Sequence, residues 1–558
     1  MNKYRNMIFF GDKQVTGIKN NVDSTEPGIK DRTEFLVLTF AVAILSLIYI
    51  SLPNYRFFSD GLQFAVEMKY SPDWILHPHH VLYPLLPQIV RRYTGFGDGD
   101  LEFLAGWSRI VGILCLIGMV LLIRTSTKNL RTVIFGLILF TVTNAVWYFS
   151  VTPNQNSTAL FFNIFTLLLI VNTSKLERIS LSRTLAISGM IAISILGSQV
   201  NAALIFPALY VIGRNSEIPI RKNQLLVIMP ISALILSGLL TVLIGIHLGH
   251  FTGIGDFISW QRSYVFQERW WSNGFFDAVS RNAKGIIGII IGDLVHPATQ
   301  VELTGSALWI IPAQVIILLF FIIELTIAGI SYMKNRVRTT LQTIGLLVSV
   351  PIFVFSVFYI PENLNLRVLY VPGFMLFLLP SIERRYLEKT VSVRMVLIPA
   401  LILFMLFMAN LGAKYIPESH PDTNPFLVEA GEASLYISPD DIVLYPWTDR
   451  GHTQSLYLQY YIGCDALTVN KLMDIENEIP EDGFEDFLFG PDGKRAVWLQ
   501  MGLLRPEDLK SDLSSKYRKG PSDEEISAFI SKWFGKDVAE PVPEFDSYVL
   551  MKRLQENQ

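Results

Sequence analysis

Long apolar segments separated by short polar turns occupy the first three quarters of the chain. A helix needs about 20 mostly apolar residues to cross a bilayer. Segments that meet or approach this length are residues 34–52, 104–123, 130–149, 157–171, 225–248, 307–332, 341–360, 368–382 and 393–411. The pattern predicts an α-helical polytopic membrane protein.

A further apolar stretch, residues 182–213, is interrupted near its middle by Ser198, Gln199 and Asn201. At about 1.5 Å per helical residue, the stretch is long enough for one tilted span or two shortened ones. Irregular backbone at membrane depth is tolerated only where protein or water covers it. We therefore predict a helical hairpin with a buried polar tip, which brings the total to about 11 transmembrane segments.

Basic turns between these segments indicate their orientation, because short cytoplasmic loops are rich in Lys and Arg. The turns carry Arg124, Lys128 and Arg131; Lys175, Arg178 and Arg183; and Lys334, Arg336 and Arg338. If these turns lie on the cytoplasmic side of a cell membrane, residues 1–33 form a cytoplasmic polar segment, in which we expect no cleaved signal peptide. The outer loops 53–103 and 249–305 then lie on the non-cytoplasmic side.

The last part of the chain, residues 413–558, changes character and predicts a small soluble α/β domain after the membrane domain of residues 34–412. Expected strands are residues 441–445, 466–469, 496–500 and 548–552, and expected helices are 453–462, 506–516 and 522–532. The predicted topology places this domain outside the cytoplasm.

Composition agrees with a membrane protein. Only 17% of the residues are charged, against roughly 25% in soluble proteins. The region from Tyr415 onward holds 27 of the 49 acidic residues but only 13 of the 46 basic ones. The net charge of −3 therefore averages an acidic tail and a basic remainder, and it does not indicate nucleic acid as a partner. The two cysteines, Cys115 and Cys464, predict no disulfide framework.

Asp60 is the first candidate for chemistry. It follows the first span directly, in the sequence Ser59-Asp60-Gly61, where a carboxylate is easily presented to a substrate. The alternative is structural, because an Asp at this position can also cap the short helix that the following residues predict. The residues alone favour the cap slightly over catalysis.

Three histidines, His77, His79 and His80, lie in the same outer loop, and Tyr83 follows them. Their spacing would suit metal ligands. However, Pro78 breaks the local geometry, and neither a cysteine nor a second carboxylate is adjacent. We therefore favour hydrogen bonding or contact with a headgroup, and expect no metal or other cofactor, although a divalent metal is an open alternative.

Several cations stand at the predicted outer edge of the membrane. Arg109 opens the second span, and there it needs an acidic partner, a phosphate or the lipid headgroups. Arg367 and Tyr370 are three positions apart and would share a helix face, and a guanidinium suits a phosphate. Arg262 and Arg269 lie among tryptophans and tyrosines of the second outer loop, which is equally typical of an interfacial aromatic belt.

Taken together, these segments resemble the C-type (GT-C) polytopic glycosyltransferases, in the branch of the protein O-mannosyltransferases and aminoarabinose transferases. The likeness rests on the order and spacing of degenerate motifs across most of residues 34–412. The motifs are SDG at 59–61, HPHHVLYPLL at 77–86, SRIVGIL at 108–114, TPNQNSTALFF at 152–162 and RVLYVP at 367–372.

This resemblance implies a fold of about 11 to 13 spans with an outer cavity, and a polyprenyl-phosphate sugar as donor. It also implies that Asp60 is the catalytic carboxylate and that Arg367 faces the donor phosphate. Two positions depart from the family: Asn154 replaces a frequent acidic residue, and Gly61 stands where some O-mannosyltransferases have glutamate. Both departures argue against a metal-assisted or two-carboxylate mechanism.

The leading hypothesis is therefore a glycosyltransferase that passes a sugar to an unidentified lipid, glycan or protein acceptor in a single in-line displacement. One alternative is a transporter or flippase of a lipid-linked substrate. Such proteins place ionisable groups near the middle of the membrane, and only Glu324 and the uncharged hairpin tip fit that description. The other alternative is a non-catalytic relative of the glycosyltransferases.

Overall fold

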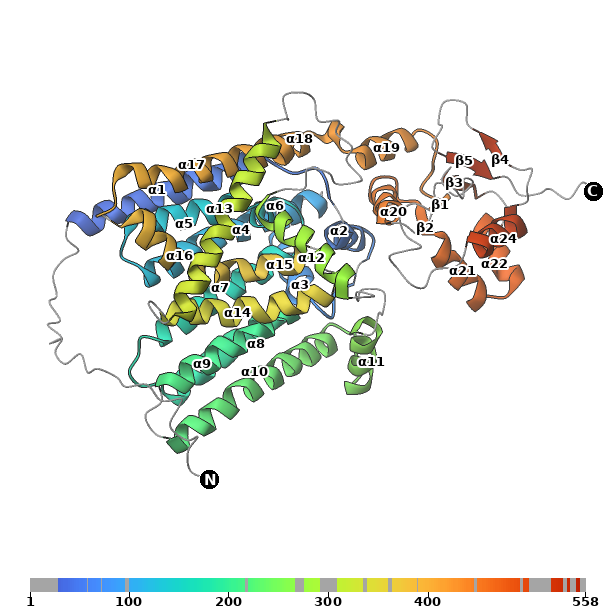
Figure 1. The fold of residues 1–558 in the computed structure, drawn as a ribbon. Helices are drawn as coiled ribbons and strands as arrows, with labels where there is room; N and C mark the ends of the chain where they lie inside the picture. Colours follow the sequence, from blue (N-terminus) through green and yellow to red (C-terminus); the bar gives the residue numbers. More distant parts are fainter. Residues whose placement is uncertain are drawn as a thin grey trace, which may run out of the picture.

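The protein consists of a bundle of apolar helices with a smaller α/β part at one end of it (Figure 1). The computed structural model describes residues 29–57, 59–71, 73–95, 100–215, 219–265, 275–291, 309–334, 339–359, 364–388, 390–445, 449–491, 495–500, 523–534, 539–541 and 548–551. Within these residues, 8 helices are long and apolar enough to cross a membrane, or 9 if a bent pair counts as one span. The chain is thus a multi-pass helical membrane protein, as the apolar pattern predicts.

Eight of the predicted spans have their main helix where the sequence places it. These helices are α1 (Ile29–Ser51), α4 (Asp100–Ser126), α7 (Gln155–Thr173), α10 (Pro219–His247), α13 (Ile310–Met333), α14 (Thr340–Phe358), α16 (Val371–Ile382) and α17 (Val393–Asn410). The last two are extended by irregular turns. Before α16 come α15 (Leu364–Arg367) and η4 (Val368–Tyr370), and after it the π-helical turn η5 (Glu383–Leu387). After α17 come the π-helical turn η6 (Leu411–Tyr415) and α18 (Ile416–Glu418).

The prediction of a single straight span over residues 130–149 is wrong. This segment is broken into α5 (Leu130–Val142) and α6 (Asn144–Val151), which are bent by 62° relative to each other. Backbone groups freed by a break in a membrane need partners. Here the Asn410 side chain donates to the Val142 carbonyl at 2.8 Å, and the Tyr415 hydroxyl donates to the Asn144 carbonyl at 2.8 Å. These partners are over 260 positions away, so the local sequence does not reveal the bend.

The predicted hairpin is confirmed and consists of α8 (Leu181–Gly197), η1 (Gln199–Leu204) and α9 (Ile205–Asn215). At its tip the buried Asn201 side chain donates to the carbonyls of Ser194 and Ala159 at 3.0 and 3.1 Å, and accepts from Asn163 at 2.8 Å. At its open end Arg183 donates to Thr173 at 2.9 Å. The Asn201 side chain, which interrupts the apolar run, is therefore satisfied by groups inside the protein.

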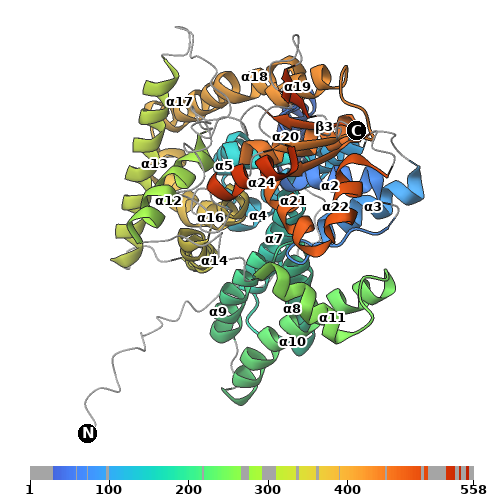
Figure 2. The same ribbon diagram turned by 90° about the vertical axis from the view of Figure 1, so that its right-hand side faces the viewer.

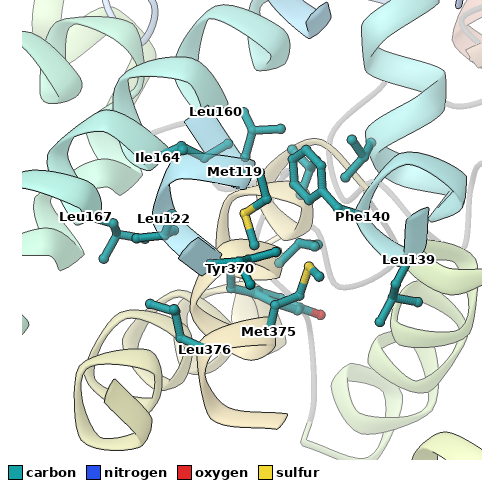
Figure 3. Close-up of a cluster of buried hydrophobic side chains, with 14 of the residues drawn as sticks. Met119, Leu122, Leu139, Phe140, Leu160, Ile164, Leu167, Tyr370, Met375 and Leu376 are labelled. Carbon is teal, nitrogen blue, oxygen red and sulfur yellow. The ribbon is translucent and has the colours of Figure 1, made fainter. Parts of the chain in front are cut away.

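A continuous apolar core joins the central helices. Figure 3 shows Met119 and Leu122 of α4 meeting Phe140 of α5, Ile164 of α7 and Met375 of α16. The close crossing of α14 and α16 depends on a glycine. A Cβ atom at Gly345 would lie 2.3 Å from the Gly373 carbonyl oxygen, and small residues permit this approach between membrane helices.

One end of the bundle collects the basic turns, and we call it the basic end. There Arg124 pairs with Glu34 at 2.5 Å, and Lys175 donates to the Thr125 carbonyl at 2.7 Å. Arg214 at the end of α9 contacts Thr340 at the start of α14. The first two turns that the sequence assigns to the cytoplasm thus lie together, whereas Arg336 and Arg338 of the third turn lie outside the described residues. Which side of the membrane this end faces remains a prediction.

The opposite end carries the short helices of the first and second loops. They are α2 (Ser59–Tyr70), α3 (Leu82–Thr94), α11 (Ile254–Val265) and α12 (Phe275–Ile290). The C-terminal elements sit at the same end. Figure 2, turned to face them, shows these elements in front of the membrane helices, with α10 and α11 to one side.

The C-terminal part is built on a five-stranded sheet of order β2-β1-β3-β5-β4. Its strands are β1 (Ile442–Tyr445), β2 (Asp465–Thr468), β3 (Val497–Gln500), β4 (Ala539–Pro541) and β5 (Tyr548–Met551). β1 pairs in parallel with β2 and β3, whereas β5 pairs antiparallel with β3 and β4. Each of the four predicted strands lies within one residue of an observed one, and the sequence missed only β4.

The helices of this part are η7 (Pro421–Thr423), α19 (Pro425–Ala433), α20 (Asp449–Tyr461), α21 (Val469–Glu478), α22 (Glu481–Phe489) and α24 (Asp523–Phe534). The predictions for 453–462 and 522–532 correspond to α20 and α24. The predicted helix 506–516 lies outside the described residues, and α21 and α22 were not predicted.

The C-terminal part packs directly on the first loop. Its Tyr457 hydroxyl accepts a hydrogen bond from the Phe57 amide at 3.0 Å, and its Tyr460 hydroxyl accepts one from the Leu101 amide at 3.1 Å. One buried apolar cluster includes side chains from α2 and α20. The first loop and the C-terminal part therefore share the end of the molecule opposite the basic end.

Candidate active site

Asp60 lies in the first turn of α2, where the partial positive charge of a helix N-terminus favours a carboxylate. Its Oδ2 accepts a hydrogen bond from Nε2 of Gln155 at 2.5 Å. Gln155 is the first residue of α7. The alternative that Asp60 caps α2 does not hold, because Asp60 is inside the helix, which begins at Ser59.

Gly61 explains how α2 and α7 come so close. A Cβ atom at Gly61 would lie 1.6 Å from the carbonyl oxygen of Pro153, a distance that no side chain can occupy. The start of α2 therefore rests directly on the turn before α7. The glutamate that some relatives carry at this position is sterically excluded here.

Asn154, the second departure from the family, caps α7. Its Oδ1 accepts from the Asn156 amide at 2.8 Å, and its own amide donates to the Ser108 hydroxyl at 3.3 Å. This side chain satisfies an amide that the first turn of the helix would otherwise leave unpaired. The turn at residues 152–154 is thereby fixed to both α7 and α4.

Gln155 has one further property of interest. Its side chain is 1% exposed, and its Oε1 accepts no hydrogen bond from any residue that the structure describes. A buried acceptor without a partner costs free energy. The amide that binds Asp60 thus offers an adjacent acceptor for a ligand hydroxyl.

The three histidines pack together between α2 and the hairpin tip. The rings of His77 and His80 stack at 5.5 Å, and the Phe64 ring, one turn beyond Asp60, contacts His77 edge-on at 5.8 Å. Nδ1 of His79 lies 3.0 Å from Oε1 of Gln199. The sequence predicted hydrogen bonding for these histidines, and the hairpin tip supplies the partner.

Burial holds His77 and His80 neutral. Burial lowers the pKa of His77 to about 4 and that of His80 to about 3, although the negative charge of Asp60 acts in the opposite direction on both. A neutral imidazole can donate and accept hydrogen bonds at once. Within the described residues, no group of three or more His, Cys, Asp or Glu side chains has the arrangement of a metal site.

Tyr83 of α3 closes the other side of this cluster. Its ring is completely buried and lies 5.5 Å from that of Phe64. Burial raises the pKa of the Tyr83 hydroxyl well above its usual range, while the neighbouring Ser108 hydroxyl lowers it and Asp60 raises it further. Asp60, Tyr83 and the histidines are therefore close enough to influence one another electrostatically, which is expected of residues in one active site.

The predicted cations have different surroundings. Arg109 of α4 is half-buried beside Tyr55 and forms neither an ion pair nor a hydrogen bond with any described residue. Arg262 of α11 is exposed, while its neighbour Gln261 accepts a hydrogen bond from Gln199 at 3.3 Å. Arg269 lies outside the described residues.

Arg367 is completely buried between α15 and α12. It donates to Oδ1 of Asn282, and its Nη1 lies 3.5 Å from the Tyr370 hydroxyl. The expected proximity of Arg367 and Tyr370 is therefore observed. Arg367 thus contacts Asn282 and Tyr370, whereas Asp60 contacts Gln155, so the expectation that both residues act on one donor remains a prediction.

The structure thus gathers Asp60, His77, His79, His80 and Tyr83 around the starts of α2 and α7. Sequence reasoning missed three neutral side chains that hold this group: Gln155, Gln199 and Ser108. Gln155 could have been predicted, because it directly follows the Pro-Asn turn of the motif TPNQNSTALFF. Gln199 was expected at the buried hairpin tip and Ser108 belongs to the motif SRIVGIL, but nothing local to either residue indicates its contact in the candidate site.

No protein-family model matches this sequence, and no curated protein sequence matches it significantly. Solved structures do match. ArnT from Cupriavidus metallidurans in the apo state has a TM-score of 0.56 and 13% identity, covering 93% of this chain and 98% of ArnT. The same protein bound to undecaprenyl phosphate has a TM-score of 0.54 and 12% identity, covering 93% and 97%.

An oligosaccharyltransferase from Archaeoglobus fulgidus, tethered to an acceptor peptide, has a TM-score of 0.50 and 12% identity, covering 93% of this chain and 74% of that protein. At such low identity, these likenesses establish the fold alone. The fold is that of the C-type polytopic glycosyltransferases in the branch of ArnT, as the sequence motifs predicted.

Proposed function

We propose that this protein, which has the fold of the C-type glycosyltransferases, transfers a sugar from a polyprenyl-phosphate donor to an acceptor, with Asp60 as the catalytic carboxylate. The observation that carries the proposal is the Asp60–Gln155 hydrogen bond at 2.5 Å, which fixes a carboxylate at the junction of α2 and α7. ArnT has this fold, and one of its solved structures contains bound undecaprenyl phosphate.

The chemistry is a single in-line displacement. As an acceptor hydroxyl attacks the anomeric carbon of the sugar, Asp60 takes its proton, and the bond between that carbon and the phosphate oxygen breaks. The lipid phosphate departs with the electron pair. Aspartate is a weak base, but the hydroxyl becomes acidic as the bond forms, so a late proton transfer suits it.

The charge that develops on the leaving phosphate needs a cation. Arg109 supports this role best, because its guanidinium is not engaged by any described residue and it lies in the first half of α4, toward the end of the bundle that carries Asp60. Arg367 is a second candidate, although its complete burial requires a rearrangement before a phosphate can reach it. The donor's tail would remain in the bilayer beside these helices.

A transporter finds little support in the structure. The uncharged break at Ser198–Asn201 is the tip of a hairpin with satisfied hydrogen bonds. Glu324 accepts hydrogen bonds from Arg385 and Tyr386 at 2.9 and 2.8 Å. Both features that favoured transport are therefore engaged in holding the fold.

The proposal further places the N-terminus in the cytoplasm and Asp60 with the C-terminal part on the other side. A donor test checks the reaction class: purified protein receives labelled sugar on polyprenyl phosphate or on a nucleotide, with membrane extract as the acceptor source. Transfer from the lipid-phosphate donor alone supports the proposal. Transfer from the nucleotide donor alone contradicts it.

A further inference from the structure

The basic end of the bundle contains a cavity far from Asp60. Its volume is about 150 Å³, and it is lined by Ile327, Ser331, Gln342, Ser381, Arg384 and Arg385. These residues come from α13, α14, α16 and the π-helical turn η5. In Figure 1, α16 lies toward the left of the bundle, while α13 and α14 pass through its middle. The cavity wall combines two guanidinium groups with two hydroxyls and an amide.

One of these guanidinium groups is held firmly in place. Glu324 of α13 is completely buried, and its Oε1 accepts from Arg385 at 2.9 Å and from the Tyr386 hydroxyl at 2.8 Å. A buried carboxylate is costly unless it is paired. Arg385 is therefore fixed on one side by Glu324, while its side chain remains 34% exposed.

The π-helical turn makes this arrangement possible. The Glu388 amide donates to the Glu383 carbonyl at 2.8 Å, five residues back, which widens the turn. Consecutive residues Arg385 and Tyr386 thereby both reach Glu324. Glu383 on the same turn accepts instead at 2.8 Å from Thr127, which directly follows α4.

The cavity has an excess of hydrogen-bond donors and of positive charge. Arg384 is exposed and forms neither a hydrogen bond nor an ion pair with any described residue. A guanidinium has five donors, and Arg385 uses one of them on Glu324. Because Glu324 neutralises one arginine, the two guanidinium groups leave one net positive charge for a ligand. A phosphate group provides the matching charge and acceptors.

The surroundings of the cavity indicate that a lipid carries this phosphate. On α13, Ile323 and Ile330 are 51% and 42% exposed in the isolated chain, so they face acyl chains in a bilayer. Both lie within a turn or so of the lining residue Ile327. A headgroup in the cavity would leave its acyl chains against this apolar surface, whereas a free phosphate would gain nothing from it.

We propose that this cavity binds the phosphate of an anionic membrane lipid, with Arg384 and Arg385 as the cationic contacts and Ser331 and Ser381 as hydroxyl donors. Basic pockets between membrane helices bind anionic headgroups in this manner. The site is independent of the proposed reaction, because it lies at the end of the bundle opposite Asp60.

The test is native mass spectrometry of the full-length protein in detergent, titrated with phosphatidylglycerol or with phosphatidylcholine. Three variants are compared with the wild type: Arg384→Ala removes a contact, Ser331→Leu fills the cavity without changing its charge, and Arg394→Ala is the control. Arg394 is also exposed and begins α17, but it does not line the cavity. A third titration adds inorganic phosphate as a competitor.

We expect the wild type and Arg394→Ala to bind one phosphatidylglycerol more tightly than phosphatidylcholine. Arg384→Ala and Ser331→Leu should each weaken that binding at least about tenfold, in line with the loss of a charge-assisted hydrogen bond. Equal binding of phosphatidylglycerol by the wild type and both cavity variants overturns the site. Complete displacement of the lipid by millimolar inorganic phosphate overturns its assignment to a lipid.

Discussion

Gln155 donates a hydrogen bond from Nε2 to Oδ2 of Asp60 at 2.5 Å, across 95 positions of the chain. This contact joins the first turn of α2 to the first residue of α7. The turn that precedes Gln155 is itself held by Gly61 and Ser108. The candidate catalytic carboxylate is therefore oriented by a neutral amide.

Replacing Gln155 tests whether this orientation matters. Gln155→Ala removes the amide that binds Oδ2 of Asp60, and we expect kcat to fall by about 10- to 100-fold, because misplacement by about 1 Å is enough for a loss of that size. Gln155→Glu places a second carboxylate beside Asp60, and like charges at this distance repel each other. The pH profile of kcat should then shift upward, and steady-state kinetics across pH measure it.

Gln63→Ala is the matched control for Gln155→Ala. It removes an amide from the helix that carries Asp60, but the Nε2 of this amide binds Glu67, at 2.8 Å. This variant should retain wild-type kinetics. If Gln155→Ala is as active as Gln63→Ala, the amide does not position the carboxylate.

Gly61 should tolerate no side chain. In Gly61→Ala the new Cβ meets the Pro153 carbonyl oxygen at 1.6 Å, so the start of α2 must move away from α7. We expect a loss of about 1–3 kcal/mol in stability together with reduced activity. Thermal unfolding measures the first, with Gly106→Ala as the control, because a Cβ at Gly106 meets nothing within 4 Å. Equal melting temperatures for the two variants would show that the close approach is wrong.

Much of the fold could be predicted because apolar length and basic turns act locally. Eight of the spans, the hairpin and four of the five described strands of the C-terminal sheet follow from such patterns. The bend between α5 and α6 could not be predicted, because Asn410 and Tyr415 stabilise it from over 260 positions away. No proline or glycine marks the break.

The site was predictable in its charged members and not in its neutral ones. A carboxylate after the first span is conspicuous, so Asp60 and the histidine cluster were found. Gln155 and Gln199 belong to the candidate site because the starts of α7 and η1 pack against the first loop. Their local sequence does not indicate this packing. Arg367 shows the reverse: its position in the sequence suggested an open edge, whereas packing against α12 buries it completely.

The histidine cluster predicts a pH dependence of stability. Histidine has an ordinary pKa of about 6.5, whereas burial lowers that of His77 to about 4 and that of His80 to about 3. The unfolded chain therefore binds more protons than the folded one between roughly pH 3 and 6.5, so stability rises with pH through this window. At pH 5.5 each histidine should cost on the order of 1 kcal/mol relative to pH 8.

Melting temperatures measured between pH 5 and 8 check this expectation. His80→Gln removes one titrating group, and its melting temperature should fall less steeply on acidification than that of the wild type. His420→Gln, at an exposed position of the C-terminal part, should follow the wild-type curve. Identical slopes for all three proteins would mean that the cluster is protonated as easily in the folded state as in the unfolded one.

Variants of Arg109 and Arg262 distinguish a cation that acts on the donor from one that only faces the membrane surface. We expect Arg109→Ala to raise KM for a phosphate-linked donor about tenfold or more, because a lost charge-assisted contact is worth roughly 1.5–3 kcal/mol. Arg262→Ala removes an exposed arginine and should change KM less than twofold. Donor titrations with both variants decide this. Equal effects would remove Arg109 from the donor site.

Asp60→Asn is the most direct test of the central claim. The variant keeps the shape of the side chain and can still bond to Gln155, but it cannot accept a proton. Asp73→Asn is the control, since Asp73 is exposed in the same loop. With labelled sugar on polyprenyl phosphate, initial rates should fall by about 10²–10⁴-fold for Asp60→Asn and remain unchanged for Asp73→Asn. Full transfer by Asp60→Asn would contradict the assignment of this carboxylate to catalysis.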